Sequence, residues 1–293
     1  MIKWPNDLIV DIARRRCVLY LGAGISANSK SRNGNKSPAT WKVFLINILE
    51  KEKNQIGVKY ESIMGIIDKG DYLLACEVIV NILGKTFTDL VEDEFRRPGY
   101  KFTKIHETIY RLDSRVVITP NIDKIYDQCA GQLSDSTIVV KNYYDKDLAS
   151  YLRKPDYLII KAHGDVDTPD RVVFTHEQYN QMRSENADFY RIMEALLLTH
   201  TFVFLGCGIN DPDIQLMLEN HNFSFVGCKP HYFVTQNDKL TPEVIKSIER
   251  NRNLKTIVYE HDEGGHINLC DGLQDLAEKV EEERNKISQR TTW

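Results

Sequence analysis

The stretch Val18-Leu19-Tyr20-Leu21-Gly22-Ala23-Gly24-Ile25-Ser26 decides the fold of this 293-residue chain. Its four apolar residues, which follow a basic cluster, are typical of a buried parallel strand. The two glycines that come next, one residue apart, predict a sharp turn into a helix, whose free backbone N–H groups can stabilise a pyrophosphate. Gly22-x-Gly24-x-x-Ala27 is equally compatible with a tight turn after a core strand.

The segment after this turn argues against an ordinary dehydrogenase. The usual dinucleotide fingerprint has an acidic residue about 20 positions further on, within a strand–helix–strand unit of ~30 residues. Residues 28–38 are instead polar, basic and interrupted by glycine and proline, which predicts a loop. The next convincing strand comes only at 115–119, so we expect an insertion between the first two strands.

The composition is that of a globular protein, with 42% hydrophobic and 27% charged residues. The length suits one large domain, or one domain with a sizeable insertion. The formal net charge of −4 gives no sign of affinity for nucleic acids or membrane surfaces. The longest apolar run, residues 195–209, is broken by polar residues and is shorter than the ~18 apolar residues of a spanning helix. The first residues carry no hydrophobic signal segment, so we expect a cytoplasmic protein.

The six cysteines form no recognisable metal or dithiol motif. No two of them have the C-x-x-C spacing, so neither a zinc ribbon nor a redox pair is predicted. Cys17, Cys129 and Cys207 stand beside apolar or small residues, and we expect them to be buried and unreactive.

Strands alternate with helices along the chain. The sequence predicts strands at 17–22, 115–119, 137–140, 157–161, 202–206, 231–234 and 256–259. It predicts helices at 5–16, 40–49, 60–69, 71–83, 86–96, 103–112, 121–130, 145–152, 187–199, 211–220 and 272–288. This alternation is typical of an α/β fold, here a Rossmann-like parallel sheet with helices on both faces. We expect residues 1–34 and 103–293 to form that domain and residues 35–102 to form an all-helical insertion subdomain.

Polar clusters follow four of the predicted strands, and parallel strands bring such clusters to one edge of the sheet, where ligands bind. The clusters are residues 22–26, 119–123, 163–165 and 206–213. Each has an alternative interpretation. Asn121 or Asp123 could cap a helix, and Asp211 could open the next helix ahead of Pro212. His163 could be a structural histidine, and the glycines of the last cluster could form a tight turn.

Taken in order, these clusters resemble the NAD site of the sirtuin family. The resemblance rests on Gly22-Ala23-Gly24-Ile25-Ser26, Thr119-Pro120-Asn121-Ile122-Asp123, His163-Gly164 and a Gly206-x-Gly208 strand end. Three wider motifs are similar to those of the bacterial sirtuin-like domains of anti-phage defence. They are Lys161-Ala162-His163-Gly164-Asp165, Phe174-Thr175-x-x-Gln178-Tyr179 and Phe204-Leu205-Gly206-Cys207-Gly208-Ile209-Asn210-Asp211-Pro212-Asp213-Ile214. The similarity covers roughly residues 15–270.

The resemblance implies a role for each matching position. Asn121 would orient the nicotinamide ribose and a water, Asp123 would recognise the nicotinamide carboxamide, and His163 would be the catalytic histidine. The residues that would line the pyrophosphate, ribose and adenosine regions are Gly22, Ala23, Gly24, Ser26, Thr119, Gly206, Cys207 and Gly208. Cys207 and Gly208 stand where deacylating sirtuins have Thr-Ser, so their contacts are expected to differ.

Two departures from the deacylating sirtuins bear on function. Residues 165–205 contain no cysteine, so the two cysteine pairs that hold zinc in those enzymes are missing and no zinc is expected. The loop after the first glycine turn lacks the family's Gly-Ile-Pro-Asp-Phe-Arg run, and whether Arg32 replaces its arginine stays open. The NAD half of the site is retained, whereas the acyl-peptide channel has little support.

The resemblance therefore implies an NAD+ glycohydrolase that releases nicotinamide and ADP-ribose and depletes NAD+ in infected cells. The departing nicotinamide is already cationic, so this reaction needs no general acid, unlike that of ordinary glycosidases. The alternatives are a sensor of NAD+ or ADP-ribose that gates a partner ATPase or nuclease, and a protein deacylase. The resemblance also implies a homo-oligomer with a separate partner, such as a HerA-type ATPase or an Argonaute, since this chain has no Walker motif.

Overall fold

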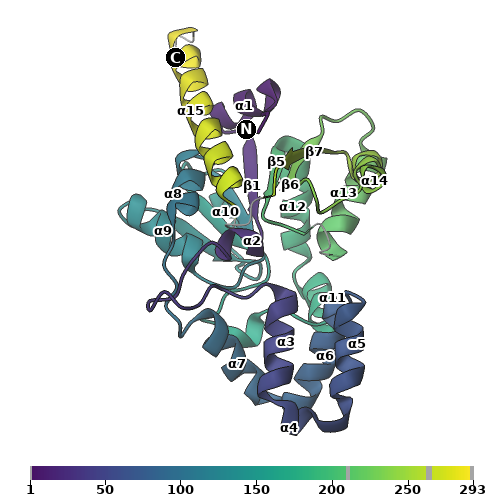
Figure 1. The fold of residues 1–293 in the computed structure, drawn as a ribbon. Helices are drawn as coiled ribbons and strands as arrows, with labels where there is room; N and C mark the ends of the chain where they lie inside the picture. The colour runs from purple at the N-terminus through teal and green to yellow at the C-terminus, as the bar shows by residue number, and fades with distance from the viewer. Residues whose placement is uncertain (1, 209–211, 262–265, 291–293) are drawn as a thin grey trace.

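The computed structural model describes residues 2–208, 212–261 and 266–290. Within them, seven parallel strands form one sheet in the order β3-β4-β2-β1-β5-β6-β7 (Figure 1). The strands are β1 (Cys17–Leu21), β2 (Val116–Thr119), β3 (Val139–Asn142), β4 (Leu158–Lys161), β5 (Thr201–Leu205), β6 (His231–Gln236) and β7 (Leu254–Tyr259). The α/β parallel sheet predicted from the sequence is thereby confirmed. The strand order places β1 at the centre, with β2 and β5 on either side.

The central strands carry apolar side chains on both faces, and helices cover both faces of the sheet. In β1, Leu19 and Leu21 pack into one core, whereas Val18 and Tyr20 pack into the other. The first core includes residues of α1 (Asn6–Ala13), α8 (Lys104–Arg111), α9 (Ile125–Leu133) and α15 (Ile267–Arg290). The second includes residues of α10 (Leu148–Tyr151), α11 (His176–Glu185), α12 (Ala187–Thr199), α13 (Pro212–Ser224) and α14 (Pro242–Arg252).

A helical lobe lies beyond the carboxyl end of β1, with the short helix α2 (Ala23–Ser26) between them (Figure 1). Its helices are α3 (Trp41–Lys51), α4 (Lys53–Ile56), α5 (Tyr60–Asp68), α6 (Tyr72–Leu83) and α7 (Lys85–Phe95). They share a core of their own, which also takes in Ile122, Val166, Val172 and Phe174. The helices of this lobe fall within the predicted insertion of residues 35–102, whose status as a separate subdomain stays a prediction.

Several predicted elements differ from the structure at their ends. The helix expected at 121–130 begins only at Ile125, since Asn121 and Asp123 make contacts that a helix would prevent. The strand expected at 137–140 spans Val139–Asn142, and the helix expected at 145–152 shrinks to the single turn of α10. The polar helices α11 and α14 were not predicted, whereas α2 follows the predicted glycine turn and α4 lies within the predicted helical insertion. The residue Asp211, expected to open α13, lies outside the described residues.

Candidate active site at the carboxyl edge of the sheet

The turns that follow β1 and β5 are packed directly against each other. Gly22 N donates to Leu205 O at 2.9 Å, and Gly24 N donates to Gly206 O at the same distance. A Cβ on Gly22 would lie 2.6 Å from Gly206 O, and one on Gly24 would lie 2.9 Å from it. The three glycines therefore serve the close approach of two turns. Gly22 is buried in this contact, whereas Ala23 and Gly24 are half-buried at the edge of the sheet.

Asn121 ties the end of β2 to the turn after β1. Its Nδ2 donates to Gly22 O at 2.9 Å and to Ser26 Oγ at 3.0 Å. Thr119 supports the same junction, because its Oγ1 donates to Leu21 O at 2.6 Å and accepts from Asn121 N at 3.1 Å. With both amide hydrogens engaged, Asn121 presents its Oδ1 as an acceptor. No donor to this oxygen is found among the described residues.

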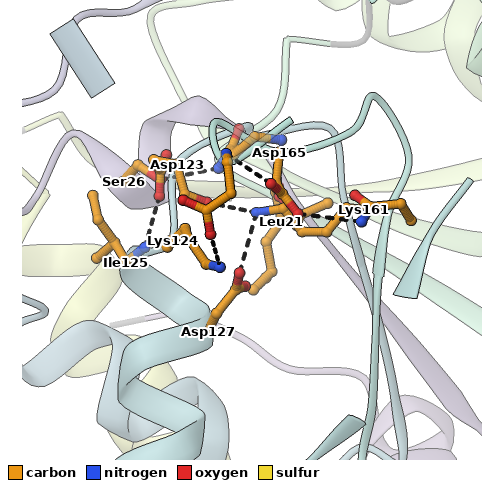
Figure 2. Close-up of polar contacts among 12 residues, drawn as sticks. Leu21, Ser26, Asp123, Lys124, Ile125, Asp127, Lys161 and Asp165 are labelled. Carbon is orange, nitrogen blue, oxygen red and sulfur yellow. Dashed lines mark hydrogen bonds and ion pairs between the residues drawn. The ribbon is translucent and has the colours of Figure 1, made fainter. Parts of the chain in front are cut away.

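Asp123 fixes the turn ahead of α9 through one oxygen of its carboxylate. Its Oδ1 accepts from Ile125 N at 3.0 Å, so its carboxylate closes the turn that leads into α9. The side chain is buried, with a relative exposure of 5% for the residue. Figure 2 shows Asp123 close to Ser26, Lys124 and Ile125. Asp123 Oδ2 accepts no hydrogen bond from the part of the chain that the structure describes, so it can receive a donor from a ligand.

His163 follows β4 and lies beside the end of β2. Ala162 N donates to Thr119 O at 2.8 Å, which fixes this segment against the Asn121 turn. His163 is 6% exposed as a residue, and its Nε2 lies 3.1 Å from Tyr179 Oη. The two rings meet edge to face at 5.3 Å, so Tyr179 fixes the orientation of the imidazole. Gly164 has φ +81°, and a Cβ there would lie 2.7 Å from Arg171 O.

Charged residues form a second layer beneath these side chains (Figure 2). The Lys161 ammonium is 1% exposed, donates to Asp123 O at 2.5 Å and lies 3.5 Å from Asp127 Oδ2. Burial raises the pKa of the Asp127 carboxyl, and the positive charge of Lys161 opposes this shift. The sequence motifs contain Lys161 and Tyr179 but indicate no role for either residue. The sequence analysis did not identify Asp127. A lysine at the end of an otherwise apolar strand was the available signal.

The segment after β5 is described only in part. Cys207 is half-buried, with its Sγ at 3.3 Å from Leu205 O and 3.5 Å from Tyr20 O, whereas Cys17 and Cys129 are fully buried. Gly208 is exposed at the end of the described segment. The motif residues Ile209, Asn210 and Asp211 lie outside the described residues.

Arg32 lies at the edge of the helical lobe. Its backbone N donates to Pro98 O at 3.1 Å, and its guanidinium lies against Gly99. The loop that carries it is fastened by Glu94, which pairs with Lys36 and accepts from Ala39 N at 3.0 Å. This placement assigns the Arg32 guanidinium to a packing contact beside α7.

The described residues contain neither a metal-binding cluster nor a helix that could span a membrane. Among residues 2–208, 212–261 and 266–290, no group of three or more His, Cys, Asp or Glu side chains could hold a metal ion. No helix in the same ranges is long and apolar enough to cross a membrane.

The chain is similar to one protein family and to several known proteins. Residues 115–257 match the family described as a SIR2-like domain. The chain is 21% identical over 303 residues to the NAD(+) hydrolase ThsA of Bacillus cereus (strain MSX-D12), covering 98% of this chain and 58% of that protein. It is 22% identical over 290 residues to the defense-associated sirtuin 2 of Bacillus subtilis, covering 93% of this chain and 26% of that protein. The NAD(+) hydrolase ThsA of Enterococcus faecium is 28% identical over 131 residues, or 44% of this chain and 27% of that protein. The chain thus spans little more than half of the first relative and about a quarter of the second.

Proposed function

We propose that this chain, whose residues 115–257 match the SIR2-like domain family, is an NAD+ glycohydrolase that yields nicotinamide and ADP-ribose. One observation carries the proposal: Asn121 is anchored through Nδ2 to Gly22 O and Ser26 Oγ, and its Oδ1 is left to accept from a ligand. Asp123 follows two residues later, and the His163 segment is hydrogen-bonded to the same turn. Acceptors for a ribose hydroxyl and an amide therefore lie beside an imidazole at one sheet edge.

The reaction breaks the bond between ribose C1′ and the nicotinamide nitrogen. The bond's electron pair goes to the cationic ring, which leaves as neutral nicotinamide, so no proton donor is required at this step. Water adds to the electron-poor C1′ and releases one proton. Asn121 Oδ1 accepts from the ribose hydroxyl or the water and orients it, and Asp123 Oδ2 accepts from the carboxamide N–H of the leaving group. His163 takes the proton, as an imidazole can near pH 7.

The experiment that tests this function is nicotinamide release from NAD+ by the purified protein, alone and with the product of the neighbouring gene. Asn121→Ala and His163→Ala are expected to lose release by at least a hundredfold, within the range that general bases contribute. His176→Ala is the matched control, since this exposed histidine begins α11 and lies 3.9 Å from Asp71, away from the proposed site. Full turnover in His163→Ala would remove the proposed base.

The same assay separates the alternative functions. NAD+ that binds without turnover under either condition would favour the sensor of NAD+ or ADP-ribose. Turnover that depends on an acylated peptide would favour the deacylase, which the absence of cysteine from residues 165–205 argues against.

We further propose that the protein acts as a homo-oligomer with a separate partner, such as a HerA-type ATPase, and depletes cytoplasmic NAD+ in anti-phage defence. The support is the motif resemblance and a relative that is named for defence. Light scattering on the purified chain, with and without the neighbouring gene product, tests both assemblies. A monomer under both conditions would contradict them.

A further inference from the structure

A fully buried lysine lies directly behind the residue proposed to grip nicotinamide. Lys161 ends β4, and Ile159, two residues earlier, packs into the core beneath α9, so Lys161 faces the same side of the sheet. Its side chain is 1% exposed, and removing its charge from water is costly unless the charge is paired and hydrogen-bonded. A lysine at this position therefore needs a specific partner.

Lys161 has two partners, and they contribute differently. Asp127, in the first turn of α9, is 7% exposed and supplies the compensating charge at 3.5 Å. Neither of its carboxylate oxygens accepts a hydrogen bond from a described residue. The close hydrogen bond of the ammonium, at 2.5 Å, goes instead to the peptide oxygen of Asp123. Asp127 thus neutralises the lysine, whereas the directional contact is to the Asp123 backbone.

This contact fixes the turn from which the Asp123 side chain projects. The peptide oxygen of Asp123 is held by Lys161, and its Oδ1 is held by Ile125 N at 3.0 Å. Two fixed points on one residue leave Oδ2 with a defined direction. We propose that Lys161, neutralised by Asp127, is a positioning residue that aims Asp123 Oδ2 at the carboxamide of nicotinamide. This inference rests on the proposed NAD+ hydrolysis.

A purely structural role for the pair makes a different prediction. Replacing a buried ion pair with apolar residues of similar volume is often neutral for stability, whereas removing one partner leaves an uncompensated charge. The double variant Lys161→Met/Asp127→Leu therefore keeps the core filled while it removes the bond to Asp123 O. Its melting temperature reports folding separately from any effect on Asp123.

Substrate discrimination is the readout that a structural role would not change. We would compare kcat/KM for NAD+ with that for its 3-acetylpyridine analogue, whose ketone lacks the carboxamide N–H. The preference for NAD+ is expected to fall at least tenfold in Lys161→Met/Asp127→Leu and in Asp123→Ala, with no further loss when all three changes are combined. Lys124→Met is the matched control, because this lysine makes a partly exposed pair with Asp167 and should keep the preference. An unchanged preference in the double variant, whatever its absolute rate, would overturn the inference.

Amide hydrogen exchange tests the same inference without turnover. The Ile125 amide, which donates to Asp123 Oδ1, is expected to exchange at least tenfold faster in the double variant, while amides of β1 keep their protection. Unchanged exchange at Ile125 would show that Lys161 does not hold the turn. If the wild-type protein releases no nicotinamide, the proposed function fails, and the exchange result still decides whether Lys161 positions Asp123.

Discussion

Substitution of Gly206 by alanine tests whether the close contact between the turns after β1 and β5 stabilises the candidate site. Gly206 has φ +64°, and a Cβ there would lie 2.6 Å from Ile25 N and 2.9 Å from Ile25 Cγ1. A non-glycine residue in the left-handed region costs about 1–2 kcal/mol. Overpacking against a backbone atom that cannot move away adds about 1–3 kcal/mol. We therefore expect Gly206→Ala to lower the free energy of unfolding by about 2–5 kcal/mol.

A matched glycine separates the two contributions. Gly34 has φ +76° in an exposed loop, and a Cβ there would meet nothing within 4 Å. Gly34→Ala therefore carries the conformational cost alone, about 1–2 kcal/mol. Urea denaturation of both variants would measure the difference, which the turn–turn contact predicts to be about 1–3 kcal/mol. Because Ile25 lies between Gly24 and Ser26, nicotinamide release should also fall in Gly206→Ala and persist in Gly34→Ala.

The result that would refute this reasoning is equal destabilisation. The free energies of unfolding of the two variants would then differ by no more than about 0.5 kcal/mol, the usual scatter of surface substitutions. In that case the close contact of the two turns does not contribute to stability. The turns would then be adjacent without constraining each other. Asn121, whose Nδ2 donates to Gly22 O, would then be bonded to a turn that Gly206 does not hold in place.

Two further predictions concern parts of the molecule away from the sheet edge. Burial lowers the pKa of both His106 and His231 to about 4, so between pH 6.5 and 4 the unfolded chain binds protons that the native chain does not. Stability should fall on acidification by up to about 1.4 kcal/mol per pH unit for each histidine, and His231→Asn should reduce this slope in urea titrations at pH 7 and 5; an unchanged slope would contradict the assignment. Glu94→Ala leaves the Ala39 amide without its acceptor, so it should cost about 1–3 kcal/mol and speed proteolysis within residues 28–38. Unchanged cleavage kinetics would show that Glu94 does not fasten this loop.

The strands were predictable because parallel strands buried on both faces are written as continuous apolar runs. Residues 18–21, 116–118 and 202–205 are each such a run, and all are fully buried. Convergence of the polar clusters followed from the parallel arrangement, and hydrogen bonds between the turns after β1, β2 and β5 now report it directly. Local pattern and strand direction were sufficient for this much of the site.

The parts of the fold and site that the sequence did not predict depend on contacts between distant segments or on helices with few buried side chains. Asp127 and Lys161 are 34 positions apart, and only the packing of α9 against β4 brings them together. Polar α11 and α14 bury few side chains, although both begin with a usable signal. Thr175 and Gln178 form a capping box at α11, and Thr241 precedes a proline at the first position of α14.

The position of the candidate site is set by the helical lobe as well as by the sheet. Ile122 packs into the lobe's core although it lies between Asn121 and Asp123, and Ile122 O accepts from Val166 N at 2.9 Å. Val166 belongs to the same core, two residues beyond Gly164, so the lobe contacts both the Asn121 turn and the segment that carries His163. Close-packed cores transmit displacement because they contain little free volume. The lobe therefore helps to position both segments that carry the proposed catalytic groups.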